Sequence, residues 1–200
     1  NYKNDIVKSR ILSKTGLCDR IYARQCKIIE LDYTACKAFL EKTHIQGHCA
    51  SKINYGLTYN DELVSVMTFG KCRFGKNADF ELLRFSNKLN TTVVGAASKL
   101  FRHFLNNIEC SRIVSYSDFS FNKGEIYKLL GFEFSHNTSH NYYYTSDYKT
   151  VYNRINYQKH KLSGLLANVN TSLTEWENMK NNGFDRIWDC GNSVYYWKKR

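Results

Sequence analysis

One run of small residues in this sequence is well suited to bind an anion: Val94, Gly95, Ala96, Ala97 and Ser98. The run follows a predicted strand that ends at Phe85 and opens a predicted helix, so its backbone amides could approach a pyrophosphate closely. The positive end of the helix dipole favours the same charge. Lys99 and Arg102 would add cations near the mouth of this site. The alternative is tight packing of a helix on a sheet, which also needs small residues.

A second group of residues suits contact with nucleic acid. Its basic members could neutralise phosphates, and they are Arg154, Lys159, His160, Lys161, Lys198, Lys199 and Arg200. Tyr152 and Tyr157 lie among them and could stack on exposed bases. The alternative is a flexible basic linker between two folded parts.

Three residues could form a metal cluster, namely His44, His48 and Cys49, because three or four positions separate residues on one helix face. Gly47 is expected to end the helix between them, and the sequence offers no evident fourth ligand. We therefore predict no metal site.

The elements that must position these residues follow from the hydrophobic pattern. Strands are predicted at 26–31, 53–59, 63–69, 80–85, 112–116, 132–134 and 142–144. Helices are predicted at 33–43, from the 90–98 segment to about 108, and at 125–130. This order predicts an α+β fold in which helices flank a mixed, mostly antiparallel sheet.

Three regions are expected along the chain. Residues 1–25 are basic and weakly patterned, which is typical of a lead-in or linker, and residues 26–145 form the α+β domain. Residues 146–200 are expected to form an extension. In it, a basic linker precedes a helix near 173–180 and a hairpin of 184–188 with 194–197.

Composition narrows the function classes. The chain has 200 residues and a formal net charge of +11, which favours a polyanionic partner or an anionic cofactor. The longest apolar runs are too short to span a membrane. Seven cysteines, an odd number, fit free thiols in a reducing cytoplasm.

Residues 92–97 and 124–132 together resemble the two signature motifs of the Gcn5-related N-acetyltransferase (GNAT) family. Thr92 stands where that family usually has Arg or Gln, and Ser120 stands where it often has Asn. The resemblance covers about 26–145 and implies a GNAT-like fold with acetyl-CoA, or a related acyl-CoA, as cofactor. It implies that residues 94–99 hold the pyrophosphate and that Tyr127 protonates the departing thiolate.

A second resemblance spans nearly the whole chain. The segments that carry it are 39–47, 81–85, 94–101, 115–118, 157–162 and 183–192. They are similar to the C-terminal region of phage homing-endonuclease proteins, in which a Vsr-like nuclease domain precedes a GNAT-like module. Residues 5–11 look like the junction after that nuclease, so the resemblance implies DNA as partner and an upstream nuclease in the same chain. It implies that this sequence contains no DNA-cleaving residues.

The GNAT-like module is also similar in outline to the Mom family of phage proteins, which modify adenine in DNA. This similarity suggests a nucleobase amine as the acceptor, and such a weakly basic amine needs a base beside it. Asp118 is the preferred candidate and His44 the second, although a turn or a helix end would also explain each. Three functions stay open: acyl transfer to a DNA base, non-catalytic DNA targeting for a homing endonuclease, and acetylation of a protein or small amine.

Overall fold

The computed structural model describes residues 3–75, 77–121 and 124–199 and divides the chain into two units. Unit 1 consists of Asn1–Tyr116, Gly124–His136 and Val194–Arg200, and unit 2 consists of Ser117–Lys123 and Asn137–Ser193. Each unit has its own hydrophobic core. The boundary therefore differs from the expected division at 145, because the last residues of the chain return to unit 1.

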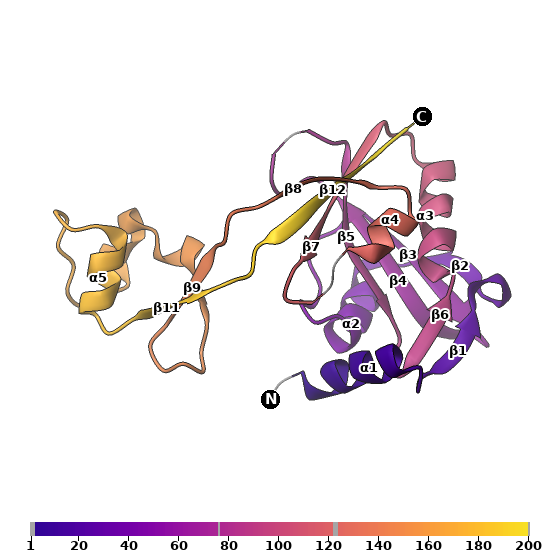
Figure 1. Ribbon diagram of the computed structural model, residues 1–200, viewed down its shortest axis with the longest axis horizontal. Coiled ribbons are helices and arrows are strands. Elements are labelled where there is room, and N and C mark those ends of the chain that lie inside the picture. The colour runs from indigo at the N-terminus through magenta and orange to yellow at the C-terminus, as the bar shows by residue number, and fades with distance from the viewer. Residues whose placement is uncertain (1–2, 76, 122–123, 200) are drawn as a thin grey trace. The chain divides into compact units, whose positions relative to one another are not determined.

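A seven-stranded sheet in the order β2-β3-β4-β5-β7-β12-β8 is the centre of the fold (Figure 1). Its strands are β2 (Lys27–Glu30), β3 (Ile53–Tyr59), β4 (Glu62–Gly70), β5 (Phe80–Asn87), β7 (Arg112–Asp118), β8 (Glu133–Asn137) and β12 (Asn192–Lys198). Strands β2 to β5 pair antiparallel, whereas β5 and β7 pair parallel. The predicted mixed, mostly antiparallel sheet is confirmed.

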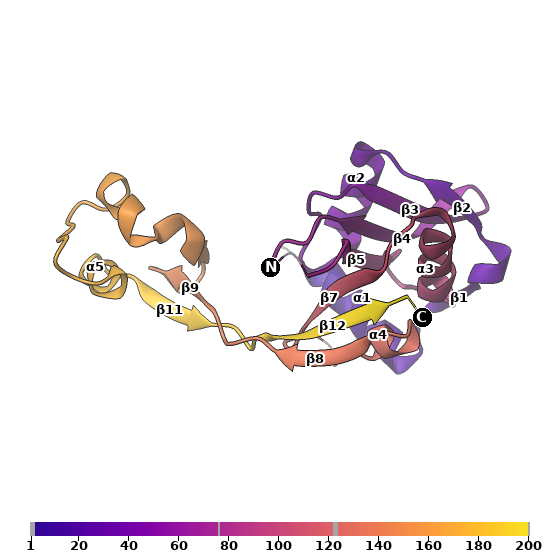
Figure 2. The same ribbon diagram turned by 90° about the horizontal axis from the view of Figure 1, so that it is seen from above.

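Two helices cover opposite faces of this sheet. Val66 and Met67 are successive residues of β4, so their side chains point to opposite faces. Helix α2 (Tyr33–Thr43) packs Leu40 against Val66, whereas α3 (Ala96–Asn107) packs Leu100 and Phe104 in the core that contains Met67. In both views the central strands run between α2 and α3 (Figures 1 and 2). Helix α4 (Glu125–Leu129) ends before Gly131, whose φ of 81° is the left-handed conformation that commonly follows a helix.

Residues 3–25, expected to be a lead-in, are folded as part of unit 1. They form α1 (Asn4–Thr15), β1 (Asp19–Tyr22) and the 3₁₀ turn η1 (Ala23–Gln25). Strand β1 pairs parallel with β6 (Thr91–Val94), and the two lie side by side in Figure 1. Ser9 accepts a hydrogen bond from the Asn90 amide at 2.7 Å. These contacts were not visible in the sequence because α1 buries only Ile6 and Ser9.

Unit 2 is built on a three-stranded sheet in the order β10-β9-β11. Its elements are β9 (Tyr142–Thr145), β10 (Tyr152–Asn153), η2 (Arg154–Tyr157), η3 (Lys159–Gly164), α5 (Glu175–Asn181) and β11 (Asp185–Trp188). Thr174 and Glu177 cap the start of α5 reciprocally. Tyr144, Leu162 and Met179 are fully buried in its core. No helix within the described ranges is long and apolar enough to cross a membrane.

The predicted terminal hairpin does not form. Strand β11 pairs with β9, and β12 joins the seven-stranded sheet, where it lies beside β8 (Figure 2). Both segments form strands, but Val194 and Tyr195 are buried in unit 1 whereas β11 belongs to unit 2. The alternation of side chains predicts a strand without naming the partner with which it pairs.

Candidate functional site

The predicted anion-binding run begins α3 as expected. Gly95 is the N-cap with φ 80°, a left-handed conformation that favours glycine, and no side chain among the described residues caps the helix. An α-helix leaves its first amides without partners inside the helix. Ala96 and Ala97 are buried against the sheet, while Ser98 and Lys99 are half-buried. The run therefore packs on the sheet on one side and leaves an uncapped helix start on the other, and its binding of an anion stays a prediction.

Beside this helix start lies a cavity of about 510 Å³. Its lining residues all belong to unit 1 and are Tyr22, Ala23, Arg24, Ile28, Val94, Gly95, Ser98, Lys99, Arg102, His103 and Asn106. Arg24, Lys99 and Arg102 give the cavity three cations, and no Asp or Glu is among the described residues that line it. A β-carbon added at Gly95 would have only Ala23 within 4 Å, at 3.8 Å, so the cavity reaches the backbone there.

Lys99 does more than supply charge. Its Nζ donates hydrogen bonds to the carbonyl oxygens of Ala23, at 2.9 Å, and Cys26, at 2.6 Å. These two bonds attach the η1 turn to α3 and hold one wall of the cavity against the other. Lys99 is therefore a clamp between two elements as well as a positive charge at the helix start.

The two parallel strands of the sheet pair over a short stretch. Strands β5 and β7 pair at Phe80 with Ile113 and at Glu81 with Val114. One residue further, the Ser115 hydroxyl donates to the Leu82 carbonyl at 2.8 Å. The remaining residues of the two strands, within the described ranges, form no regular pairs with each other.

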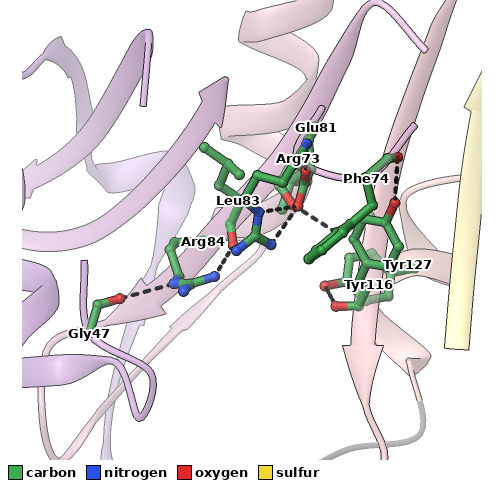
Figure 3. Close-up of polar contacts among 10 residues, drawn as sticks. Gly47, Arg73, Phe74, Glu81, Leu83, Arg84, Tyr116 and Tyr127 are labelled. Carbon is green, nitrogen blue, oxygen red and sulfur yellow. Dashed lines mark hydrogen bonds and ion pairs between the residues drawn. The ribbon is translucent and has the colours of Figure 1, made fainter. Parts of the chain in front are cut away.

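Tyr127 of α4 contacts strand β7. Its hydroxyl donates to the Tyr116 carbonyl of β7 at 3.1 Å (Figure 3). Burial raises the pKa of its phenol above the ordinary value, while Ser115 and Arg84 oppose that rise. The phenol therefore keeps its proton throughout the physiological range.

Glu81 forms an ion pair where β5 begins to pair with β7. Its carboxylate is fully buried and accepts hydrogen bonds from the backbone amide and the Nε of Arg73, each at 2.9 Å, whereas the Arg73 side chain is 40% exposed (Figure 3). Removal of Arg73 would leave an uncompensated buried charge, so the pair fixes the loop before β5. The sequence predicted no role for Glu81.

Arg84 is a buried cation, three residues along β5 from Glu81. Its side chain donates from Nε to the Gly47 carbonyl at 2.9 Å and from Nη1 to the Leu83 carbonyl at 2.8 Å (Figure 3). Within the described ranges no carboxylate forms an ion pair with it. Burial lowers the pKa of this guanidinium, which is the electrostatic cost of holding a charge out of water. A sequence signal existed, since an Arg inside an otherwise apolar strand is unusual.

His44, the second candidate base, lies among cations. Burial lowers the pKa of its imidazole to about 3, and Arg84, Arg10 and Lys3 add to that shift. Its Nδ1 accepts a hydrogen bond from the Gln46 amide at 3.1 Å, and the Lys3 ammonium donates to the Ile45 carbonyl beside it. His44 is therefore neutral at physiological pH and is a weak base.

Asp118, the preferred candidate base, falls in unit 2 at the end of β7. Its carboxylate accepts a hydrogen bond from the Ser120 amide at 2.8 Å, as a turn residue does. No group of three or more His, Cys, Asp or Glu in the described residues could hold a metal ion.

The predicted nucleic-acid residues do not form one patch. Lys198 and Lys199 belong to unit 1, the others to unit 2, and Arg200 lies outside the described residues. Arg154 forms an ion pair with Glu175, and the Lys161 ammonium donates to the Ile155 carbonyl. Tyr157 packs against the core of unit 2, whereas Lys159 and His160 are exposed.

The charge of the chain is concentrated elsewhere. Unit 2 has seven Lys and Arg against six Asp and Glu, a net charge of +1. Unit 1 has the remaining 22 against 12, a net charge of +10. Nearly all of the net positive charge is therefore in unit 1, which contains the cavity.

No known family and no curated protein matches the sequence. Among solved structures, the chain is similar to an acetyltransferase of Bacillus subtilis in complex with CoA, with 13% identity, TM-score 0.49, and 88% of this chain and 99% of that chain covered. A GNAT family acetyltransferase of Elizabethkingia anophelis with acetyl-CoA bound has 10% identity and TM-score 0.47, covering 88% and 99%. A GNAT family acetyltransferase of Bacillus cereus has 11% identity and TM-score 0.46, covering 88% and 98%.

Proposed function

We propose that unit 1 is a GNAT-type acyltransferase that uses an acyl-CoA to modify a nucleobase amine of DNA. The observation that carries the proposal is the short pairing of β5 and β7, which ends after Glu81 and Val114, with the hydroxyl of Tyr127 bonded to β7 just beyond it. Two parallel strands that pair for only two residues leave backbone groups beyond that pairing to which an extended thioester arm could bind. The motif resemblance, with Gly95 and Tyr127 at matching positions, supports the same activity.

The residues present fit the proposed cofactor. The uncapped start of α3 offers backbone amides, Gly95 leaves room beside them, and Arg24 and Arg102 line the adjoining cavity. These groups suit a pyrophosphate with its attached nucleotide. When bound, the acyl-CoA supplies the activated acyl group.

Tyr127 is the proposed proton donor to the leaving sulfur. A thiolate is a stronger acceptor than the Tyr116 carbonyl to which the phenol now donates, and the raised pKa ensures that the proton is present. The same raised pKa makes Tyr127 an unsuitable base.

The cations around the loop after α2 support a nucleobase acceptor over a protonated amine. Lys3 and Arg84 both donate to carbonyls of that loop, and His44 within it is held neutral. A lysine ε-ammonium or a polyamine would be repelled here, whereas a neutral amine on a polyanion would be attracted. The role of Asp118 as base stays a prediction, and Asp118→Asn tests it by the loss of transfer with cofactor affinity kept.

A second function is favoured by a specific observation. The hydroxyl of Tyr127 and the ammonium of Lys99 are both engaged inside the protein. A fold that satisfies its own polar groups could serve as a non-catalytic module that positions a homing endonuclease on DNA.

Titrations of the full chain with acetyl-CoA and with duplex DNA distinguish the two functions. We expect acetyl-CoA to raise the melting temperature and radiolabelled acetyl groups to appear on DNA. Tyr127→Phe should lower the transfer rate at least about 100-fold while leaving cofactor affinity within about twofold. A response to DNA alone, weakened steeply by salt, would overturn the enzymatic proposal and support the targeting module.

A further inference from the structure

One wall of the cavity comes from the N-terminal segment of the chain. The parallel pairing of β1 with β6 places Tyr22 opposite Val94, directly before Gly95. Arg24 follows in η1, and the two bonds from Lys99 fix that turn against α3. The segment that resembles a linker in sequence is thus an integral part of this cavity.

The two side chains of this wall differ in chemistry and lie together. Tyr22 is 45% exposed as a residue, and the Arg24 guanidinium carbon is 5.0 Å from the centre of its ring. An exposed ring offers a flat apolar surface to a second ring, and the neighbouring guanidinium offers paired donors to a phosphate.

The opposite wall, formed by α3, also has polar and cationic side chains. Ser98 and Arg102 lie one turn apart on α3, and both line the cavity together with His103. Its volume of about 510 Å³ is in the range of small-molecule sites and is too small for a folded partner. Cations on both walls and an aromatic ring at one end suit a phosphorylated compound with a planar base.

We infer that Tyr22 and Arg24 form the nucleotide subsite of unit 1, where Tyr22 stacks on a purine base and Arg24, with Arg102, binds the attached phosphates. This rests on the proposed function, in which the nucleotide is the adenosine end of an acyl-CoA. Two residues of the segment 1–25 thus have a proposed binding role, whereas the sequence alone predicts only a connecting role for that segment.

Isothermal titration of the full chain with adenosine 3′,5′-bisphosphate, and separately with CoA, tests the assignment. Arg24→Gln should weaken both ligands about tenfold or more, and Tyr22→Leu should weaken them about five- to tenfold. Arg20→Gln is the matched control, because Arg20 lies on the same strand β1 but not in the cavity lining, and it should change affinity less than twofold.

Two further measurements keep the test decisive. Melting temperatures of all variants identify any loss of folding, and Arg24→Lys retains the charge but not the paired donors, so it should recover only part of the affinity. Pantetheine, which lacks the nucleotide, should bind equally to wild type and all variants.

The outcomes separate this inference from the proposed function. If CoA binds and acetyl transfer occurs but the Tyr22 and Arg24 variants bind like wild type, the nucleotide subsite is overturned and the enzymatic proposal stands. If the bisphosphate binds with the expected pattern but no acetyl group is transferred, the subsite stands and the enzymatic proposal fails. If only duplex DNA binds and Arg24→Gln weakens it, both are overturned.

Discussion

Two arginines of unit 2 and Arg84 of unit 1 are held in opposite ways. In unit 2, Arg186 lies over the rings of Trp176, at 3.9 Å, and Tyr142, at 4.5 Å. Arg154 lies 4.8 Å over Tyr142 and pairs with Glu175. In unit 1, Arg84 is buried and donates to the backbone carbonyls of Gly47 and Leu83, while Arg24 and Arg102 line a cavity.

This difference shows that a basic composition does not by itself make positive charge available to an external anion. An arginine that stacks on rings and pairs with a carboxylate stabilises a small core, and little of its potential remains for an external anion. An arginine held by neutral carbonyls keeps its charge. We therefore expect anion binding in unit 1 and a mainly structural role for the cations of unit 2, although the basic stretch at 154–161 is the more conspicuous one in sequence.

The largest expected effect is a carboxylate at the start of α3. Gly95→Glu adds a negative charge beside the cavity and strains a backbone with φ 80°, so CoA affinity should fall about 100-fold or more. Gly183→Glu is the control in unit 2, because Gly183 has the same φ of 80° and nothing within 4 Å of an added β-carbon. Calorimetric titration with CoA should show loss in the first variant alone. Equal loss in both variants would mean that backbone strain, and not the site, is responsible.

An intermediate effect is expected in the polar core of unit 2. Glu175 accepts hydrogen bonds from Tyr144, Tyr142 and Arg154, so Glu175→Gln should destabilise unit 2 by about 2 kcal/mol. Hydrogen exchange of β9 and β11 amides measures this loss, and amides of β3 and β4 in unit 1 serve as the control. Unchanged protection in unit 2 would show that the network contributes nothing to its stability.

The pH dependence of that effect has a defined sign. Burial acts to raise the pKa of Glu175, but hydrogen bonds from Tyr144 and Arg154 hold it below the ordinary value. A lowered pKa contributes stability that is present above the unfolded value, near 4.3, and is lost as the pH falls through the folded value. The difference between wild type and Glu175→Gln should therefore be constant near neutral pH and shrink in acid.

The smallest effect should come from removing exposed charge in unit 2. Lys159→Gln with Lys161→Gln should weaken duplex DNA less than about threefold, because unit 2 has a net charge of only +1. Lys8, Lys14 and Lys27 are equally exposed in unit 1, and replacing all three with Gln should weaken DNA about tenfold and reduce the salt dependence of binding. The reverse ranking would place the DNA-binding surface in unit 2.

Local signals in the sequence predicted most of the fold. The turn at Asn60 and Asp61, both with positive φ, joins the two strands expected there, and the Asp32 side chain caps α2 by accepting from the Ala35 amide at 2.7 Å. Gly95 and Gly131 mark the start of α3 and the end of α4 as expected. Each of these features depends on residues a few positions apart.

What the sequence did not predict depends on distant partners. The segment expected to open α3 forms β6 first, because β1 lies alongside it, and the strands of the expected terminal hairpin pair elsewhere. The roles of Glu81 and Arg84 depend on Arg73 and Gly47, which only the folded chain brings near them. Periodicity identifies a buried face but not the polar groups that will be buried with it.

The β1–β6 pairing also has a consequence for the order of assembly. Asp19 and Thr91, its first paired residues, are 72 positions apart, so the pair closes a long loop and is slow to form compared with the hairpins inside that loop. A nascent or truncated chain can thus build β2 to β5 and still lack half of its nucleotide pocket. Ligand occupancy would then report complete maturation of the polypeptide, which makes a nucleotide analogue a convenient probe of late folding.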